Sequence, residues 1–123
     1  MIQRLKKRRD FLAAAKGSRA AKRAFVLETR RRGDDGPARV GFTVSKRVSK
    51  KAVERNRIRR RLREAVRQVA PERALPGHDY VLVGRRSALT EKFGHIATEL
   101  AGAMAPRPKG QAGAAAKPAS ESR

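Results

Sequence analysis

The sequence predicts an α+β protein, a two-layer sandwich of one mixed sheet with helices, for two reasons. Apolar residues recur at every second position in some segments and at every third or fourth position in others, which indicates both strands and helices. These segments follow one another in the order α-β-β-α-β-α, which places helices against a single sheet. With 123 residues, the chain has room for one domain with one modest core.

A short helix and a hairpin are predicted first. The helix carries Phe11 on its apolar side and ends near Gly17. Residues 25–29 and 40–44 read as strands, because they are rich in β-formers and the second one alternates apolar with small or polar residues. Residues 32–37 between them, Arg-Gly-Asp-Asp-Gly-Pro, are typical of a turn, so we expect the two strands to pair as a hairpin.

A long helix is predicted next, over residues 53–70, and is expected to stop before Pro71. Its apolar face consists of Ile58, Leu62, Ala65, Val66 and Val69. Residues 80–83, Tyr-Val-Leu-Val, form a continuous apolar strand, which suggests burial on both faces. A last helix is expected from about Thr90, with apolar residues at the helical period.

Charge and composition point to a polyanionic partner. Lys and Arg number 32 against 11 Asp and Glu, a formal net charge of +21. The chain has no cysteine, no apolar run that could span a bilayer and no signal-peptide core near its start, so we expect a cytoplasmic protein. Residues 1–104 are expected to form a single RNA-binding domain, and residues 105–123, rich in Ala, Pro and Gly, a disordered basic tail.

The basic residues of the long helix lie opposite its apolar face. At about 100° per residue, Asn56, Arg60, Arg63 and Arg67 form one ribbon, whereas Arg55 is expected to point toward the apolar side. Like charges four residues apart destabilise a helix by about 0.2–0.5 kcal/mol per pair. Such a helix is expected to need a polyanion, and RNA is the partner that we predict.

The sequence shows no sign of a metal site or of a catalytic site within the protein. His78 and His95 are isolated from each other and from any cysteine, so no metal site within the protein is predicted. No pair of carboxylates or nucleophile with its base is recognisable. Phe42, Tyr80 and Phe93 are expected in the core rather than on an RNA surface.

Residues 44–64 resemble the signature of the bacterial ribonuclease P protein component. The resemblance extends over residues 4–104, with Asp10-Phe11 and the strands at 25–27 and 79–81 in the family's places. The matching positions are Val44, Ser45, Lys46, Arg47, Val48, Ala52, Val53, Arg55, Asn56, Arg57, Ile58, Arg59, Arg60, Arg63 and Glu64.

The resemblance implies the small subunit of a ribonucleoprotein endonuclease that removes the 5′ leader from precursor tRNA. Catalysis would belong to the RNA subunit, which holds the divalent metal (Mg²⁺), and no catalytic residue or metal is expected in the protein. The partners would be the catalytic RNA, bound 1:1 by a protein monomer, and precursor tRNA, with no membrane contact. The family's fold also contains an unusual left-handed β-α-β crossover, against the right-handed default.

Site residues follow from the same resemblance. RNA binding is assigned to Lys46, Arg47, Lys50, Lys51, Arg55, Asn56, Arg57, Arg60, Arg61, Arg63 and Arg67. Phe11 and Phe25 are assigned to a cleft for the single-stranded leader, where one base stack contributes about 1–3 kcal/mol. Two departures from the family pattern are Ala15, where some members have a second aromatic, and Ser49, where glycine is frequent.

Two other classes of protein remain open. A ribosomal or RNA-chaperone protein would explain the charge and the tail, but not the ordered Arg-Asn-Arg block. A helix-turn-helix DNA-binding protein would need a second helix just before the basic one, and here a strand precedes it. Binding to generic RNA or to duplex DNA would distinguish these classes from a ribonuclease P subunit.

Overall fold

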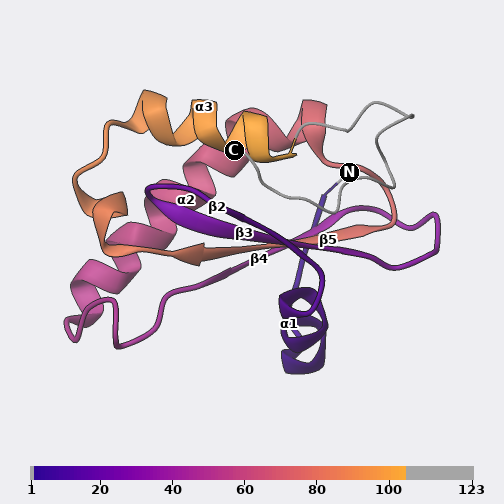
Figure 1. Cartoon of the computed structure of the whole chain (residues 1–123), viewed down its shortest axis with the longest axis horizontal. Coiled ribbons are helices and arrows are strands. Elements are labelled where there is room, and N and C mark those ends of the chain that lie inside the picture. The colour runs from indigo at the N-terminus through magenta and orange to yellow at the C-terminus, as the bar shows by residue number, and fades with distance from the viewer. Residues whose placement is uncertain (1, 105–123) are drawn as a thin grey trace.

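The computed structural model describes residues 2–104, so the predicted tail over residues 105–123 lies outside the described residues. Figure 1 shows one sheet with helices packed on it. In chain order the elements are β1 (Gln3–Arg4), α1 (Arg8–Ala15), β2 (Ser18–Ala21), β3 (Phe25–Arg31), β4 (Arg39–Thr43), α2 (Ala52–Arg73), β5 (His78–Gly84), the 3₁₀ helix η1 (Arg86–Leu89) and α3 (Phe93–Met104). The α+β class and the order of the predicted elements are confirmed.

The sheet is mixed, in the order β1-β4-β5-β3-β2. Strand β5 pairs antiparallel with β3 and parallel with β4, so the predicted hairpin of β3 with β4 is wrong. The apolar β5 takes the centre because there both of its faces are covered, as its pattern predicted. The turn that was expected to close the hairpin crosses the start of β5 instead, where Arg32 N–H donates to Gly77 O and Gly77 N–H donates to Gly36 O.

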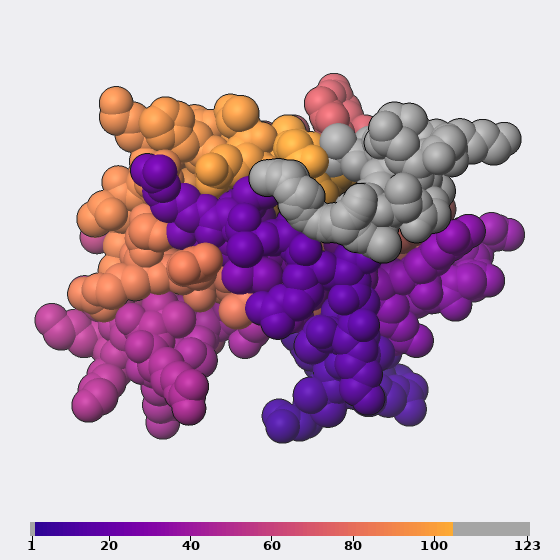
Figure 2. Space-filling view, viewed as in Figure 1, coloured from indigo at the N-terminus to yellow at the C-terminus, as the bar shows by residue number. Residues whose placement is uncertain are grey.

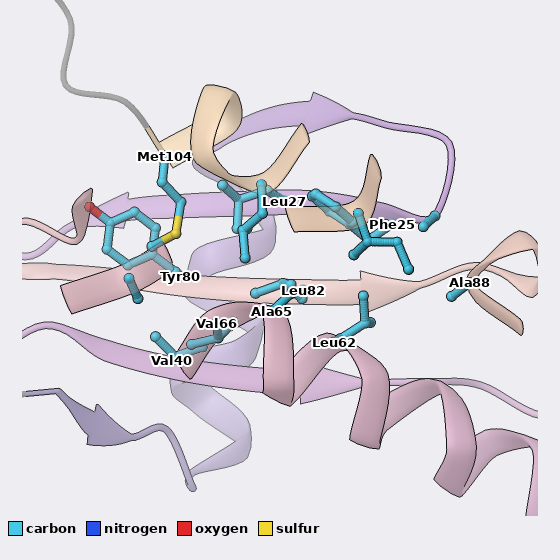
Figure 3. Close-up of a cluster of buried hydrophobic side chains, with 14 of the residues drawn as sticks. Phe25, Leu27, Val40, Leu62, Ala65, Val66, Tyr80, Leu82, Ala88 and Met104 are labelled. Carbon is cyan, nitrogen blue, oxygen red and sulfur yellow. The ribbon is translucent and has the colours of Figure 1, made fainter. Parts of the chain in front are cut away.

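Helix α2 connects the parallel strands β4 and β5 in a left-handed crossover. In Figure 3, α2 lies in front of the sheet, both strands run from left to right, and β5 (Tyr80, Leu82) lies above β4 (Val40). Turned so that the strands point upward, β5 is to the left of β4, which is the rare hand. The hand implied by the resemblance is therefore present.

Both faces of the sheet carry helices. Helices α2 and α3 cover one face, and the main core lies beneath them, with Phe25, Leu62 and Leu82 among its fully buried side chains (Figure 3). Helix α1 lies on the opposite face, over a smaller cluster that includes Leu5 and Val81. The two expected layers thus gain a partial third, formed by α1.

Element boundaries differ from the predictions in several places. Helix α2 does not stop before Pro71 but continues to Arg73. Pro71 lies in the last turn, where its missing N–H removes only one hydrogen bond, and the N–H of Ala74 still donates to Ala70 O. The last helix begins at Phe93, after η1. Strands β1 and β2 were not predicted, since two and four residues carry too little periodicity to recognise. No helix among residues 2–104 is long and apolar enough to cross a membrane.

Candidate nucleic-acid interface

The outer side of α2 presents a row of exposed polar side chains. Asn56, Arg60, Arg63 and Arg67 are all exposed, as the helical period predicted, and so is Arg57 beside them. The opposite side is buried against the sheet through Ile58, Leu62, Ala65 and Val66. We call Asn56, Arg57, Arg60, Arg63 and Arg67 the α2 ribbon.

The side chain of Asn56 is oriented by Arg59, three residues further along α2. Its amide oxygen accepts a hydrogen bond from Arg59 at 3.0 Å. The amide NH₂ group, a donor only, is therefore left for an external acceptor. This is a more specific arrangement than a cationic face requires, and a phosphate oxygen or a base carbonyl would satisfy it.

The start of α2 is held by Ser49, at the position where glycine is frequent in the resembled family. The buried Ser49 hydroxyl donates to Glu54, and the Ser49 carbonyl accepts from Arg55 at 2.9 Å. The hydrogen bond from Ser49, with the charges of Arg86 and Lys51, holds the pKa of Glu54 below its usual value. Arg55 thus folds back onto the loop before the helix, whereas it was expected to point toward the apolar side.

The loop before α2 supplies the remaining cations that were predicted there. Lys46, Arg47, Lys50 and Lys51 are exposed. Together with the α2 ribbon they form one basic surface along the helix and its N-terminal approach.

Arg61 has a different environment from the other predicted RNA-binding residues. Its guanidinium donates to the carbonyl oxygens of Leu89 at 3.2 Å and Glu91 at 2.6 Å, which joins α2 to the segment before α3. Two of its five N–H donors are therefore used inside the protein, so Arg61 has a structural role, and its assignment to RNA binding stays a prediction. A helical wheel cannot reveal this, since the acceptors are 28 and 30 residues away in the sequence.

A cavity of about 420 Å³ opens beside the α2 ribbon, at the point where β1 ends. Its cationic lining consists of Arg4, Lys6, Arg59 and Arg63, and its aromatic lining of Phe11 and Phe42. Arg4, Lys6 and Arg59 were not predicted as site residues, because only the parallel pairing of β1 with β4 brings the first two to this place. Basic side chains beside aromatic rings suit single-stranded nucleic acid, because they offer phosphate contacts and stacking surfaces together.

Phe42 and Phe11 occupy this cavity differently. Phe42 is partly buried against the main core, as expected, and Arg63 lies over its ring at 5.6 Å. Phe11 is partly buried against Leu5 and Val81, and its remaining surface faces the cavity. A cation over one ring and a partly open second ring give the cavity a mixed cationic and aromatic wall.

Phe25 lies elsewhere, and its assignment to a leader cleft is wrong. Its side chain is completely buried on the opposite face of the sheet, under α2 and α3. Alternation along β3 decides this, because Phe25 and Leu27 point to the same side.

A larger cavity, of about 650 Å³, lies near the other end of α2. Most of its lining is apolar, and its two charged residues are Arg67 and Asp35. The smaller cavity therefore suits a polyanion better. Among residues 2–104, no group of three or more His, Cys, Asp and Glu side chains is arranged to hold a metal ion.

A network of ion pairs holds α1 beside the smaller cavity. The fully buried Asp79 of β5 accepts from Arg32 at 2.6 Å and from Arg39 at 2.8 Å. Asp10, in α1, lies 3.5 Å from Arg39 and 3.7 Å from Arg30. Burial alone would raise the pKa of Asp79, but the hydrogen bonds from Arg39 and Arg32 outweigh it and hold that pKa below its usual value. Asp10 immediately precedes Phe11, so this network fixes the helical turn that carries the cavity's aromatic ring.

The fold, the α2 ribbon and the basic cavity beside it define an RNA-binding protein. The chain belongs to the ribonuclease P protein family, because the family model described as Ribonuclease P matches residues 2–106. That family processes the 5′ end of tRNA as a subunit of ribonuclease P.

Individual relatives agree with this membership. A ribonuclease P protein component of Caulobacter vibrioides is 45% identical over 104 residues, which cover 84% of this chain and 69% of that protein. The one from Ruegeria pomeroyi is 52% identical over 89 residues, 70% of each chain. Among solved structures, the RNase P protein of Thermotoga maritima matches with a TM-score of 0.68 at 28% identity, covering 83% of this chain and 94% of that one. The protein from Staphylococcus aureus matches with a TM-score of 0.62 at 33% identity, covering 79% and 87%.

Proposed function

We propose that this protein binds the catalytic RNA of ribonuclease P and the 5′ leader of precursor tRNA, and so assists endonucleolytic removal of the leader. The observation that carries the proposal is the position of the basic, aromatic-lined cavity directly beside the α2 ribbon. Two nucleic-acid segments can then lie on one protein, one along the helix and one in the cavity.

The α2 ribbon and the loop before it are the surface for the catalytic RNA. Arginine suits this role because its planar guanidinium makes paired hydrogen bonds to phosphate oxygens. Asn56 adds a directed donor beside the exposed Arg57 and Arg60. The protein acts there as a monomer bound 1:1 to the RNA, in the cytoplasm.

The cavity is the surface for the single-stranded leader. Arg4 and Lys6 face the leader's phosphates, and the open side of Phe11 stacks on a base. With Ala15 where some relatives have a second aromatic, stacking surface is limited, and phosphate contacts supply more of the binding.

The chemical step belongs to the RNA subunit. Divalent metal ions (Mg²⁺) held by its phosphates would activate the water that attacks the scissile phosphodiester. The protein's residues bind and orient both RNAs, and their positive charge lowers the repulsion between the two phosphate backbones.

Cleavage of a precursor tRNA by a bacterial-type ribonuclease P RNA at low millimolar Mg²⁺, with and without the protein, tests this function. We expect faster cleavage at the mature 5′ end with the protein present and none with the protein alone. Tight RNA binding without faster cleavage would contradict the proposal and favour an RNA-chaperone or ribosomal role.

A further inference from the structure

A second group of cations lies at the end of the sheet where β3 begins and β5 ends. Lys22 and Arg23 belong to the turn between β2 and β3, and Arg85 and Arg86 directly follow β5. Arg23, Arg85 and Arg86 are exposed. None of these residues belongs to the signature of the α2 region, and 63 positions of sequence separate Lys22 from Arg85.

Hydrogen bonds hold these two segments together. The N–H of Arg85 donates to Ala24 O at 3.0 Å, and its guanidinium donates to Lys22 O at 3.2 Å. The Ser87 hydroxyl donates to Arg23 O. The backbone therefore keeps Lys22, Arg23 and Arg85 clustered in spite of the repulsion between their charges.

The cluster joins the basic surface of α2 through Arg86. The Arg86 guanidinium lies 3.3 Å from the carbonyl oxygen of Val48 and 3.3 Å from a carboxylate oxygen of Glu54. Figure 1 shows the turn between β2 and β3, η1 and the loop before α2 at the same (left) end of the molecule, and Figure 2 shows side chains projecting from all three segments there.

Acidic side chains do not neutralise the cluster. Glu54 pairs with Arg86, whereas Lys22, Arg23 and Arg85 form no ion pair with any side chain in the described part of the chain. A fixed group of cations without carboxylates attracts phosphates. The turn and η1 contain no aromatic residue, so the cluster is suited to backbone contact rather than to base stacking.

We propose that Lys22, Arg23 and Arg85 form a second phosphate-binding surface, which contacts an RNA backbone running past the loop before α2 to this end of the sheet. The proposal rests on the proposed function and extends its RNA interface beyond α2 and the cavity. The phosphates belong either to the catalytic RNA or to precursor tRNA, and separate binding measurements distinguish the two.

The test compares two double variants that remove the same charge. Arg23→Gln/Arg85→Gln changes the cluster, whereas Arg31→Gln/Arg73→Gln changes two arginines near the opposite end of the sheet, where β3 ends and β5 begins. Affinity is measured over a series of salt concentrations, first for a bacterial ribonuclease P RNA alone, then for precursor tRNA bound by the assembled holoenzyme. We expect the first variant to bind one of these RNAs about tenfold more weakly at low salt, with a log–log salt slope shallower by about 1–2, and the control to change less.

Whichever of the two affinity measurements changes identifies the RNA that these residues contact. Equal affinities and slopes for the two variants in both arms would overturn the proposal, while stimulation of cleavage by the wild-type protein would still support the proposed function. Should Arg85→Gln loosen the turn in a thermal melt, Lys22→Gln/Arg23→Gln decides by the same criterion, because these two side chains form no hydrogen bond in the described structure.

Discussion

Gly41 lies so close to Phe11 that a Cβ atom at position 41 would be 2.6 Å from Cζ of the phenyl ring and 2.7 Å from Cε1. The ring rests directly on the backbone of β4, and a hydrogen atom is the largest substituent that fits between them. Residue 41 of the sheet therefore decides the position of the aromatic wall of the smaller cavity.

Gly41→Ala is expected to displace Phe11 and to destabilise the fold by about 1–3 kcal/mol, because the added methyl group overpacks the contact. Urea unfolding measures the loss, and the affinity of the holoenzyme for leader-bearing precursor tRNA should fall with it. Gly102→Ala is the control, since nothing lies within 4 Å of its Cβ position and alanine favours a helix. Equal stability of the two variants would show that the ring moves aside without cost.

Phe11→Ala is expected to weaken holoenzyme binding of leader-bearing precursor tRNA by about 1–3 kcal/mol, the contribution of one base stack. Binding of mature tRNA, which has no leader, should change little. The neighbouring Leu12→Ala, at a side chain that is 53% exposed, is the control. The same loss for both tRNAs would mean that Phe11 acts through stability rather than through the leader.

Replacing Arg60 and Arg63 together by Gln is expected to weaken assembly with the catalytic RNA and to make the salt slope shallower by about 1–2, because two exposed phosphate contacts are removed. Filter binding over a salt series measures this, and circular dichroism checks that the fold is retained. Unchanged assembly, and unchanged cleavage at limiting protein, would remove these two residues from the interface.

Arg61→Gln is expected to behave differently, although Arg61 follows Arg60 directly. The substitution removes the guanidinium that donates to two carbonyl oxygens before α3, at a cost of about 1–3 kcal/mol in stability. The melting temperature should therefore fall, with a smaller change in salt slope than for the Arg60/Arg63 variant. A full loss of RNA affinity without any loss of stability would show instead that Arg61 acts mainly in RNA binding.

Asp79→Asn is expected to destabilise the protein by about 3–5 kcal/mol, since it leaves the arginines around a buried position without their anion. The pKa of Asp79 is lower in the folded protein than in the unfolded chain. Its carboxylate therefore stabilises the folded state fully at a pH above the pKa that Asp79 has when unfolded, and this stabilisation is lost as the pH falls through the pKa that Asp79 has when folded. Urea unfolding from pH 7 down into the acid range should therefore show a steeper loss for the wild type than for Asp79→Asn. Asp35→Asn, at an exposed side chain, should keep the wild-type profile.

Local sequence patterns predict much of this protein's secondary structure and the direction of many of its side chains. Three patterns depend only on neighbours within one element: the alternation of residues 40–44, the continuous apolar run at 80–83 and the 3.6-residue period of α2. The α+β class and the outward direction of Arg60 and Arg63 were therefore predictable. The motif of residues 44–64 supplied the family, which the family model and the relatives confirm.

The sequence by itself thus determined the fold class, the basic face of α2 and the family. Tertiary structure alone decided that β5 separates β3 from β4, that Arg61 is used internally and that Phe25 is core while Phe11 lines a cavity. The physical reason is distance along the chain. Periodicity reports which side of an element is apolar, whereas strand neighbours, distant carbonyl acceptors and buried ion pairs such as Arg39–Asp79 exist only once the chain has brought remote segments together.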